Sequence, residues 1–219
     1  MTTLRISIVG AESTGKTTLA GALTGRINHE FALRAVEVPE ALRHWCSVQG
    51  RTPRIDEQAG IARLQQAWID EAARDADVVV CDTTPLMIAV YSRLVFGDRS
   101  LDEMARACHA SIDFTLLTGL DVPWVADGLQ RDGPHVRGPV DASIRSHLVD
   151  WNADWAVVLG SGEARTANGL DALRRVLGAW GTRPGAPTGL FSSLLASGTG
   201  PNRPASAACP RCEPTRPLA

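Results

Sequence analysis

The sequence lacks both a long apolar run and an excess of charge of either sign. No apolar stretch among the 219 residues approaches the roughly 20 residues that a helix needs to cross a bilayer. The formal net charge is −2, which provides no general attraction to nucleic acid or to anionic membranes. We therefore expect partners that are neither nucleic acid nor membrane, while the oligomeric state stays open.

Cysteine is also sparse, and its five copies are an odd number. Cys46, Cys81 and Cys108 sit among apolar residues, where we expect them to pack as small hydrophobes in a reducing cytosol. Cys209 and Cys212 resemble half of a zinc site, but a structural zinc needs four ligands and the segment around them has no histidine. Because the first predicted strand starts close to residue 1, we expect no signal peptide and a cytoplasmic protein.

An apolar strand leads directly into a glycine-rich turn near the start of the chain. After Ile6-Ser7-Ile8-Val9 the sequence reads Gly10-Ala11-Glu12-Ser13-Thr14-Gly15-Lys16-Thr17-Thr18, which matches the P-loop pattern G-x-x-x-x-G-K-[ST]. Gly10 and Gly15 permit backbone angles that let successive N–H groups face one anion, at the positive end of the following helix. Lys16 can reach the β- and γ-phosphates, and Thr17 can offer its hydroxyl to Mg²⁺. We therefore predict that residues 10–18 bind the phosphates of ATP.

Strand-like and helix-like segments alternate along the rest of the chain. We predict strands at 6–9, 35–38, 77–82, 113–118 and 156–159, and helices at 17–28, 40–48, 55–75, from 85, 101–109, 141–155 and 163–180. The continuous apolar run at 77–82 is typical of a parallel strand covered on both faces. The pattern predicts an α/β fold over residues 1–180, a P-loop NTPase three-layer sandwich with a mostly parallel five-stranded sheet. Residues 181–219 are rich in Gly, Pro, Ser and Ala, and we predict a disordered tail there.

An acid closes the predicted strand at 77–82. Asp82 would lie at the ligand-binding edge of a parallel sheet, where a P-loop protein needs a second oxygen ligand for Mg²⁺ beside Thr17. The same carboxylate could instead take the proton from an attacking hydroxyl. As an alternative without function, Asp82 could simply cap the helix that follows it.

Residues between the second and third predicted strands are candidates for binding an acceptor. Glu40, just after Pro39, could receive sugar hydroxyls, although a surface pair with Arg43 is an alternative. Trp68 could stack on a flat ring and Gln65 could hydrogen-bond the acceptor, whereas core packing is the commoner fate of a helical tryptophan. Weaker candidates of the same kinds are Glu37 and Trp45.

The segment 122–137 is punctuated by glycine and proline and reads as a mobile lid. Its two arginines, Arg131 and Arg137, could neutralise charge on a transferring phosphoryl group, or could be ordinary surface residues. We interpret His135 as a solvated loop residue. Residues 160–162, Gly-Ser-Gly after the last predicted strand, would lie where many P-loop folds hold the nucleotide base.

Five blocks of the sequence resemble the ribosylnicotinamide kinase domain of bacterial NAD-salvage regulators, the NadR-like P-loop family. They are the P-loop at 10–18, Val38-Pro39-Glu40 with Arg43, Ile61-Ala62 with Gln65, Val80-Cys81-Asp82-Thr83, and Asp121-Val122-Pro123-Trp124-Val125-Ala126-Asp127-Gly128-Leu129. The last block is the most specific, and together they cover about residues 4–178. The family usually carries an arginine directly after this block, where this chain has Gln130 followed by Arg131.

The resemblance implies ATP-dependent phosphorylation of the 5′-hydroxyl of nicotinamide riboside, with Mg²⁺ as the metal. In that reaction Lys16 and a lid arginine, Arg131, would offset charge on the phosphoryl group, and Asp82 or Glu40 would orient or deprotonate the acceptor. Two alternatives stay open: a kinase for another nucleoside or vitamin, and an ATP-binding regulatory module that hydrolyses ATP slowly and has no small-molecule acceptor.

Overall fold

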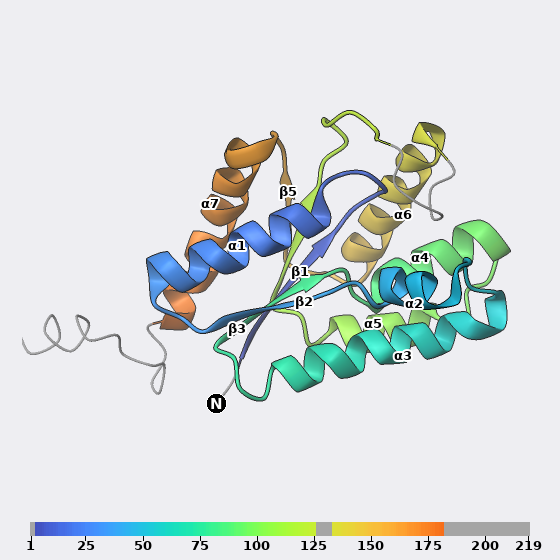
Figure 1. Ribbon diagram of the computed structural model, residues 1–219, viewed down its shortest axis with the longest axis horizontal. Coiled ribbons are helices and arrows are strands. Elements are labelled where there is room, and N and C mark those ends of the chain that lie inside the picture. The colour runs from blue at the N-terminus through green and yellow to red at the C-terminus, as the bar shows by residue number, and fades with distance from the viewer. Residues whose placement is uncertain (1–2, 126–132, 182–219) are drawn as a thin grey trace, which may run out of the picture. The chain divides into compact units, whose positions relative to one another are not determined.

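The computed structural model describes residues 3–125 and 133–181 of the chain (Figure 1). Within them, five strands alternate with helices, as the sequence predicts. The strands are β1 (Leu4–Val9), β2 (Ala35–Val38), β3 (Val78–Asp82), β4 (Phe114–Thr118) and β5 (Trp155–Val158). The helices are α1 (Lys16–Phe31), α2 (Ala41–Gln49), α3 (Ile55–Ala72), α4 (Pro85–Phe96), α5 (Asp102–His109), the 3₁₀ turn η2 (Pro134–Val136), α6 (Arg137–Asp150) and α7 (Gly162–Gly181).

The five strands form one sheet in the order β2-β3-β1-β4-β5, and every pairing is parallel. All residues of β3 are buried, as the continuous apolar run predicts for a strand covered on both sides. Since the strands are parallel, their carboxyl ends share one edge of the sheet. The loops after β1, β3, β4 and β5 therefore meet there, and the strand order changes direction at β1.

Helices cover both faces of the sheet, so the α/β three-layer prediction is confirmed. On one face α1 and α7 lie together (Figure 1) and pack against Ile6, Ile8 and Val80, with Trp180 closing the far end of this core. On the other face α3, α4 and α6 pack against strand residues, among them Val79 and Leu117, and α2 and α5 pack in turn against α3 and α4. Among the described residues, no helix is long and apolar enough to cross a membrane.

The predicted boundaries of α6 are wrong. The helix begins at Arg137, four residues before the predicted start, and ends at Asp150 rather than near Trp155, which instead opens β5. Pro139 misled the prediction, because it is the third residue of the helix, where a backbone N–H has no helical partner and proline is tolerated. The helix ends where Asn152 adopts a left-handed φ of 52°.

Three remaining expectations concern cysteines and the chain's end. Cys46 and Cys81 are buried and Cys108 is partly buried, and burial raises the pKa of the Cys81 thiol to about 12. Cys209 and Cys212 lie outside the described residues. The predicted tail at 181–219 also lies outside them, apart from Gly181 at the end of α7.

Candidate functional site

The turn between β1 and α1 has the backbone that the P-loop pattern predicts. Gly10 has φ 155° and Gly15 has φ 78°, and Ser13 also adopts a positive φ of 57°. A side chain at position 10 would lie 2.0 Å from the hydroxyl oxygen of Thr118, so β4 packs too closely for anything but glycine. The loop therefore curls tightly over the end of β4 before α1 begins.

A cavity of about 1040 Å³ opens beside this loop, and we call it cavity 1. Its walls come from the P-loop and the start of α1, from the segment after β4 and from the start of α7: Ser13, Thr14, Gly15, Lys16, Thr17, Thr18, Leu19, Ala22, Arg43, Val122, Pro123, Val125, Ser161, Gly162, Glu163, Arg165 and Thr166. Six of the nine predicted phosphate-binding residues thus line it. Of the others, Gly10 and Ala11 are buried beneath the loop, and Glu12 faces a second cavity.

Lys16 is buried at the centre of the loop. Its ammonium group donates to the carbonyl oxygen of Ala11 at 3.0 Å, across the turn. Burial lowers the pKa of Lys16, while the carboxylates of Glu40, Asp82 and Glu12 act in the opposite direction. A bound phosphate would add further negative charge beside the ammonium and favour its charged form.

Asp82 and Thr17 meet at the edge of the sheet. The Thr17 hydroxyl donates to Oδ2 of Asp82 at 2.6 Å, and the other carboxylate oxygen, Oδ1, is buried with no hydrogen-bond partner in the part of the chain that the structure describes. Burial raises the pKa of Asp82, and the hydrogen bond from Thr17 only partly offsets this effect. A hydroxyl and a carboxylate with a spare oxygen are the hard ligands that Mg²⁺ takes beside a phosphate, so these two residues fit the metal. Asp82 does not cap α4, whose N-cap residue is Thr84.

A second cavity, of about 490 Å³, lies on the other side of Lys16, and we call it cavity 2. Its lining comes from the P-loop, from the segment 52–55 and from α2, α3 and α4: Glu12, Lys16, Glu40, Leu42, Arg43, Thr52, Pro53, Arg54, Ile55, Gln58, Tyr91, Val95 and Phe96. Lys16 and Arg43 line both cavities. The size is within the range of about 300–1,000 Å³ that is typical of small-molecule sites.

Two carboxylates and two aromatic rings give cavity 2 its chemical character. Glu40 is 8% exposed and accepts a hydrogen bond from Nε of Arg43 at 3.3 Å. Glu12 is also 8% exposed, and within residues 3–125 and 133–181 its Oε2 has no hydrogen-bond partner. Tyr91 and Phe96, both from α4, offer flat apolar surface in the same lining. The cavity therefore combines acceptors for hydroxyl groups with a surface for a ring.

The other predicted acceptor residues lie outside both cavities. Gln65 is fully buried, and its amide accepts from the backbone N–H of Ala41 at 2.7 Å and donates to the Pro39 carbonyl at 3.1 Å. Both ends of the Gln65 side chain thus hold the start of α2, which corrects the expectation that it contacts an acceptor. Trp68 packs edge-on against His44 at 5.5 Å between ring centroids and is partly buried against the apolar core, which is the packing alternative.

The two weaker candidates also have partners elsewhere. Trp45 lies under the guanidinium of Arg51, 4.9 Å from the ring centroid. Glu37 faces α1, where its Oε2 is 3.2 Å from the position that a Cβ on Gly21 would take. Burial, followed by repulsion from Asp82, raises the pKa of Glu37. Neither residue lines cavity 1 or cavity 2.

The lid prediction can be followed only in part, because Arg131 lies outside the described residues. Arg137 is the first residue of α6 rather than a loop residue, and it is 7% exposed. One guanidinium nitrogen donates to the carbonyl of Val122 at 2.9 Å, while Nε and Nη2 have no hydrogen-bond partner among the described residues. His135 is exposed in η2.

The sequence interpretation missed Arg165, which lines cavity 1 from the first turn of α7. Only its place just after the last strand could have drawn attention to it, since a single arginine in a helix has no distinctive pattern. Of the predicted base-side residues at 160–162, Ser161 and Gly162 line the same cavity.

Known structures share this architecture. The chain is similar to a NadR protein in complex with NR (TM-score 0.67, 18% identity) and to a NadR protein in complex with NAD and AMP-PNP (TM-score 0.65, 17% identity). Each likeness covers 80% of this chain, which spans about half of the NadR chains, 51% and 50% respectively. A thymidylate kinase from Ehrlichia chaffeensis is also similar, with a TM-score of 0.56 and 12% identity over 80% of this chain and 100% of its own. The predicted resemblance to the NadR-like domain is thus confirmed in the fold.

The sequence itself matches no curated protein. It does match a family model described as an AAA domain, over residues 5–165, which run from β1 and the P-loop to Arg165 at the start of α7. The match therefore includes the phosphate-binding turn, Asp82 and the residues around both cavities except Thr166. The chain belongs to the AAA domain family.

Proposed function

We propose that the protein is an ATP-dependent kinase for a small nucleoside-like acceptor, and that the acceptor is nicotinamide riboside, with nicotinamide mononucleotide as the product. The observation that carries the proposal is the pair of cavities that meet at Lys16 and Arg43. A protein that only binds or slowly hydrolyses ATP needs one cavity beside its P-loop. A kinase needs two, with the phosphoryl group crossing between them.

In this proposal, cavity 1 holds ATP. The backbone N–H groups of the P-loop and the ammonium group of Lys16 bind the β- and γ-phosphates, and the base lies toward Ser161 and Gly162. Thr17 and Asp82 would hold Mg²⁺, which neutralises phosphate charge when it is bound. The lining residues of cavity 1 run from the P-loop to the start of α7, which supports this orientation of the nucleotide.

The acceptor occupies cavity 2 with its 5′-hydroxyl toward Lys16. The 5′-oxygen attacks the γ-phosphorus, the bond to the β,γ-bridging oxygen breaks, and ADP leaves. Glu40 lines cavity 2, so it is the better placed of the two predicted acids to orient the hydroxyl and accept its proton. Asp82 lines neither cavity and is assigned to the metal.

Nicotinamide riboside is supported by the chemistry of cavity 2 and by the sequence blocks shared with the NadR-like family. Its ribose hydroxyls could donate hydrogen bonds to the carboxylates of Glu12 and Glu40. Its cationic ring would be attracted by the same carboxylates and could stack on the faces of Tyr91 and Phe96. The similar NadR structure was determined in complex with NR. We expect the reaction to take place in the cytoplasm.

The test is a screen for ADP formation with nicotinamide riboside and a panel of other nucleosides, with the phosphorylated product identified by mass. Lys16→Ala should lower the turnover by about 100-fold or more, since it removes a charge that stabilises the moving phosphoryl group. Arg174→Ala is the matched control, because Arg174 pairs with Asp171 on the exposed face of α7, away from both cavities. Phosphorylation of another nucleoside in place of nicotinamide riboside would change the acceptor but keep the kinase. ADP formation that is independent of every acceptor would instead identify a regulatory ATPase.

Lys16 offers a second test of the nucleotide site, because it is the only lysine in the sequence. An acyl-phosphate derivative of ATP, which transfers its acyl group to a nearby amine, should label Lys16 and no other side chain. Excess ATP should prevent the labelling. Labelling that ATP does not reduce would contradict the assignment of cavity 1.

A further inference from the structure

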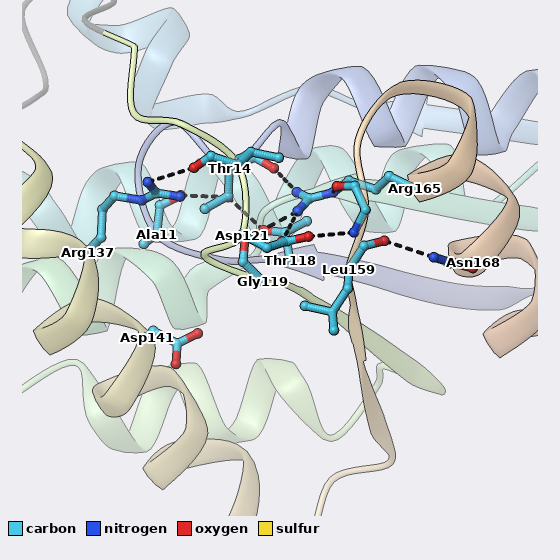
Figure 2. A network of polar contacts seen from close by, with 12 residues as sticks. Ala11, Thr14, Thr118, Gly119, Asp121, Arg137, Asp141, Leu159, Arg165 and Asn168 are labelled. Carbon is cyan, nitrogen blue, oxygen red and sulfur yellow. Dashed lines mark hydrogen bonds and ion pairs between the residues drawn. The ribbon is translucent and has the colours of Figure 1, made fainter.

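Arg165 joins three separate segments of the chain at the edge of the sheet (Figure 2). Its Nε donates to the carbonyl of Gly160 at 2.6 Å, and Nη2 reaches the carbonyl of Gly119 at 3.4 Å. Its Nη1 donates to the carbonyl of Thr14 in the P-loop. The planar guanidinium is suited to this task, since its five donors point outward in a fixed fork.

The charge of Arg165 is already compensated within this network. The Arg165 side chain is 5% exposed and forms an ion pair with Oδ1 of Asp121. The other oxygen of Asp121 accepts a hydrogen bond from the backbone N–H of Gly160 at 2.6 Å. Arg165 and Asp121 together therefore tie the ends of β4 and β5 to the P-loop, and their mutual pairing reduces the direct attraction that Arg165 can exert on a phosphate.

Thr14 is held on both its side chain and its backbone. Its hydroxyl donates to the Ala11 carbonyl at 2.8 Å and lies 2.7 Å from the Thr118 hydroxyl, while its own carbonyl accepts from Arg165. The peptide between Thr14 and Gly15 is trans, so its carbonyl and its N–H point in opposite directions. The bond to Arg165 on one side therefore directs the N–H of Gly15 to the other side.

We propose that Arg165 is a positioning residue for the phosphate site, acting through the Thr14–Gly15 peptide. Gly15 lines cavity 1 at a positive φ, and because glycine has no Cβ this peptide lacks the restraint that a side chain would add. By fixing the Thr14 carbonyl, Arg165 aims the Gly15 N–H at the bound phosphate before ATP arrives. The inference rests on the proposed nucleotide site, and it adds that the base-side loop at Gly160 and the phosphate loop are set in place by one side chain.

The test compares ATP with tripolyphosphate, which carries the phosphate chain without the nucleoside. We expect Arg165→Lys to weaken the binding of both ligands by the same factor, about 10- to 100-fold. This is the effect expected for the loss of one hydrogen bond to a charged group. A lysine keeps the charge opposite Asp121 but cannot hold several carbonyls at once. The dissociation constants can be measured by calorimetry on the full chain, with circular dichroism to verify that the variant is folded.

Two further variants sharpen the comparison. Asn168→Ala is the matched control, because Asn168 binds the Leu159 carbonyl at 3.0 Å in the same region and does not line cavity 1, so both affinities should stay at the wild-type value. Asp121→Asn keeps the bond from Arg165 to Thr14 and should lose less than Arg165→Lys. It also keeps the proposal testable should the lysine variant not fold.

The outcomes separate the possible roles of Arg165. If the affinity for ATP falls while the affinity for tripolyphosphate is unchanged, Arg165 contacts the nucleoside directly, which overturns the proposal. Unchanged affinity for both ligands in a folded variant would reduce Arg165 to a structural residue and also overturn it. A wild-type chain that binds neither ligand would refute the proposed nucleotide site itself, and this inference with it.

Discussion

The buried histidine at the end of α5 should make the protein less stable in mild acid. His109 is 5% exposed, its Nδ1 has no hydrogen-bond partner, and Nε2 lies 3.4 Å from the Thr115 hydroxyl. The ring of Trp151 lies beside the His109 ring, with 5.4 Å between their centroids. Burial lowers the pKa of His109 to about 4, because a charged imidazolium would lose its hydration there.

The size of the effect follows from the two pKa values. A histidine in the unfolded chain has a pKa of about 6.5. Between about pH 6.5 and pH 4, His109 is therefore protonated in the unfolded chain and neutral in the folded chain. The contribution of His109 to the free energy of unfolding is therefore fully present above pH 6.5 and is lost as the pH falls toward 4. Between pH 7 and pH 5 the loss amounts to about 2 kcal/mol.

Urea unfolding at pH 7 and pH 5 measures this loss for wild type and for His109→Gln, which carries no titrating group. The difference between the two pH values should be about 2 kcal/mol smaller in the variant. His135→Gln, which removes an exposed histidine, is the matched control and should behave as wild type. A variant at position 109 that loses as much stability as wild type on going to pH 5 would refute the reasoning.

The remaining predictions concern Asp82, the proposed metal ligand, and the proposed domain boundary. Burial raises the pKa of Asp82, so the folded state holds a proton there more tightly than the unfolded state, and the ionised carboxylate costs stability at neutral pH. The Asp82→Asn variant should thus melt at the same temperature as wild type or higher. Its rate of phosphoryl transfer should fall by about 100-fold or more. A much lower melting temperature would instead point to a structural role for Asp82. Deleting residues 182–219 should shift the melting temperature by less than about 2 °C, because Trp180 already closes the core. A large drop in calorimetry would contradict the domain boundary.

Local periodicity was sufficient for most of the fold. The alternation of apolar strands with helices predicted the parallel sheet, and most element boundaries agree within three residues. The failure at α6 has a local cause, since glycine and proline at 138 and 139 are compatible with either a loop or the first turn of a helix. Packing of Val140 and Ile144 against α4 and β4 favours the helix, and that packing is not visible along the chain.

The part of the site that the sequence determined is the part that is contiguous. The backbone of residues 10–18 follows from glycines at fixed spacing, and the place of Asp82 at the edge of the sheet follows from an acid at the end of a buried strand. In each case the signal lies within one segment of the sequence, although Asp82 meets Thr17 only in the folded chain.

Tertiary structure decided the rest, because those residues act across segments. Gln65 has a side chain that could hydrogen-bond a ligand. Its amide instead binds the backbone N–H of Ala41 and the carbonyl of Pro39 at the start of α2. Glu12, inside the P-loop, faces cavity 2, and Arg165 reaches Thr14 over 151 positions of sequence. Whether a polar side chain meets a ligand or a backbone carbonyl depends on which loops the sheet brings to one edge, and only the folded chain brings them together.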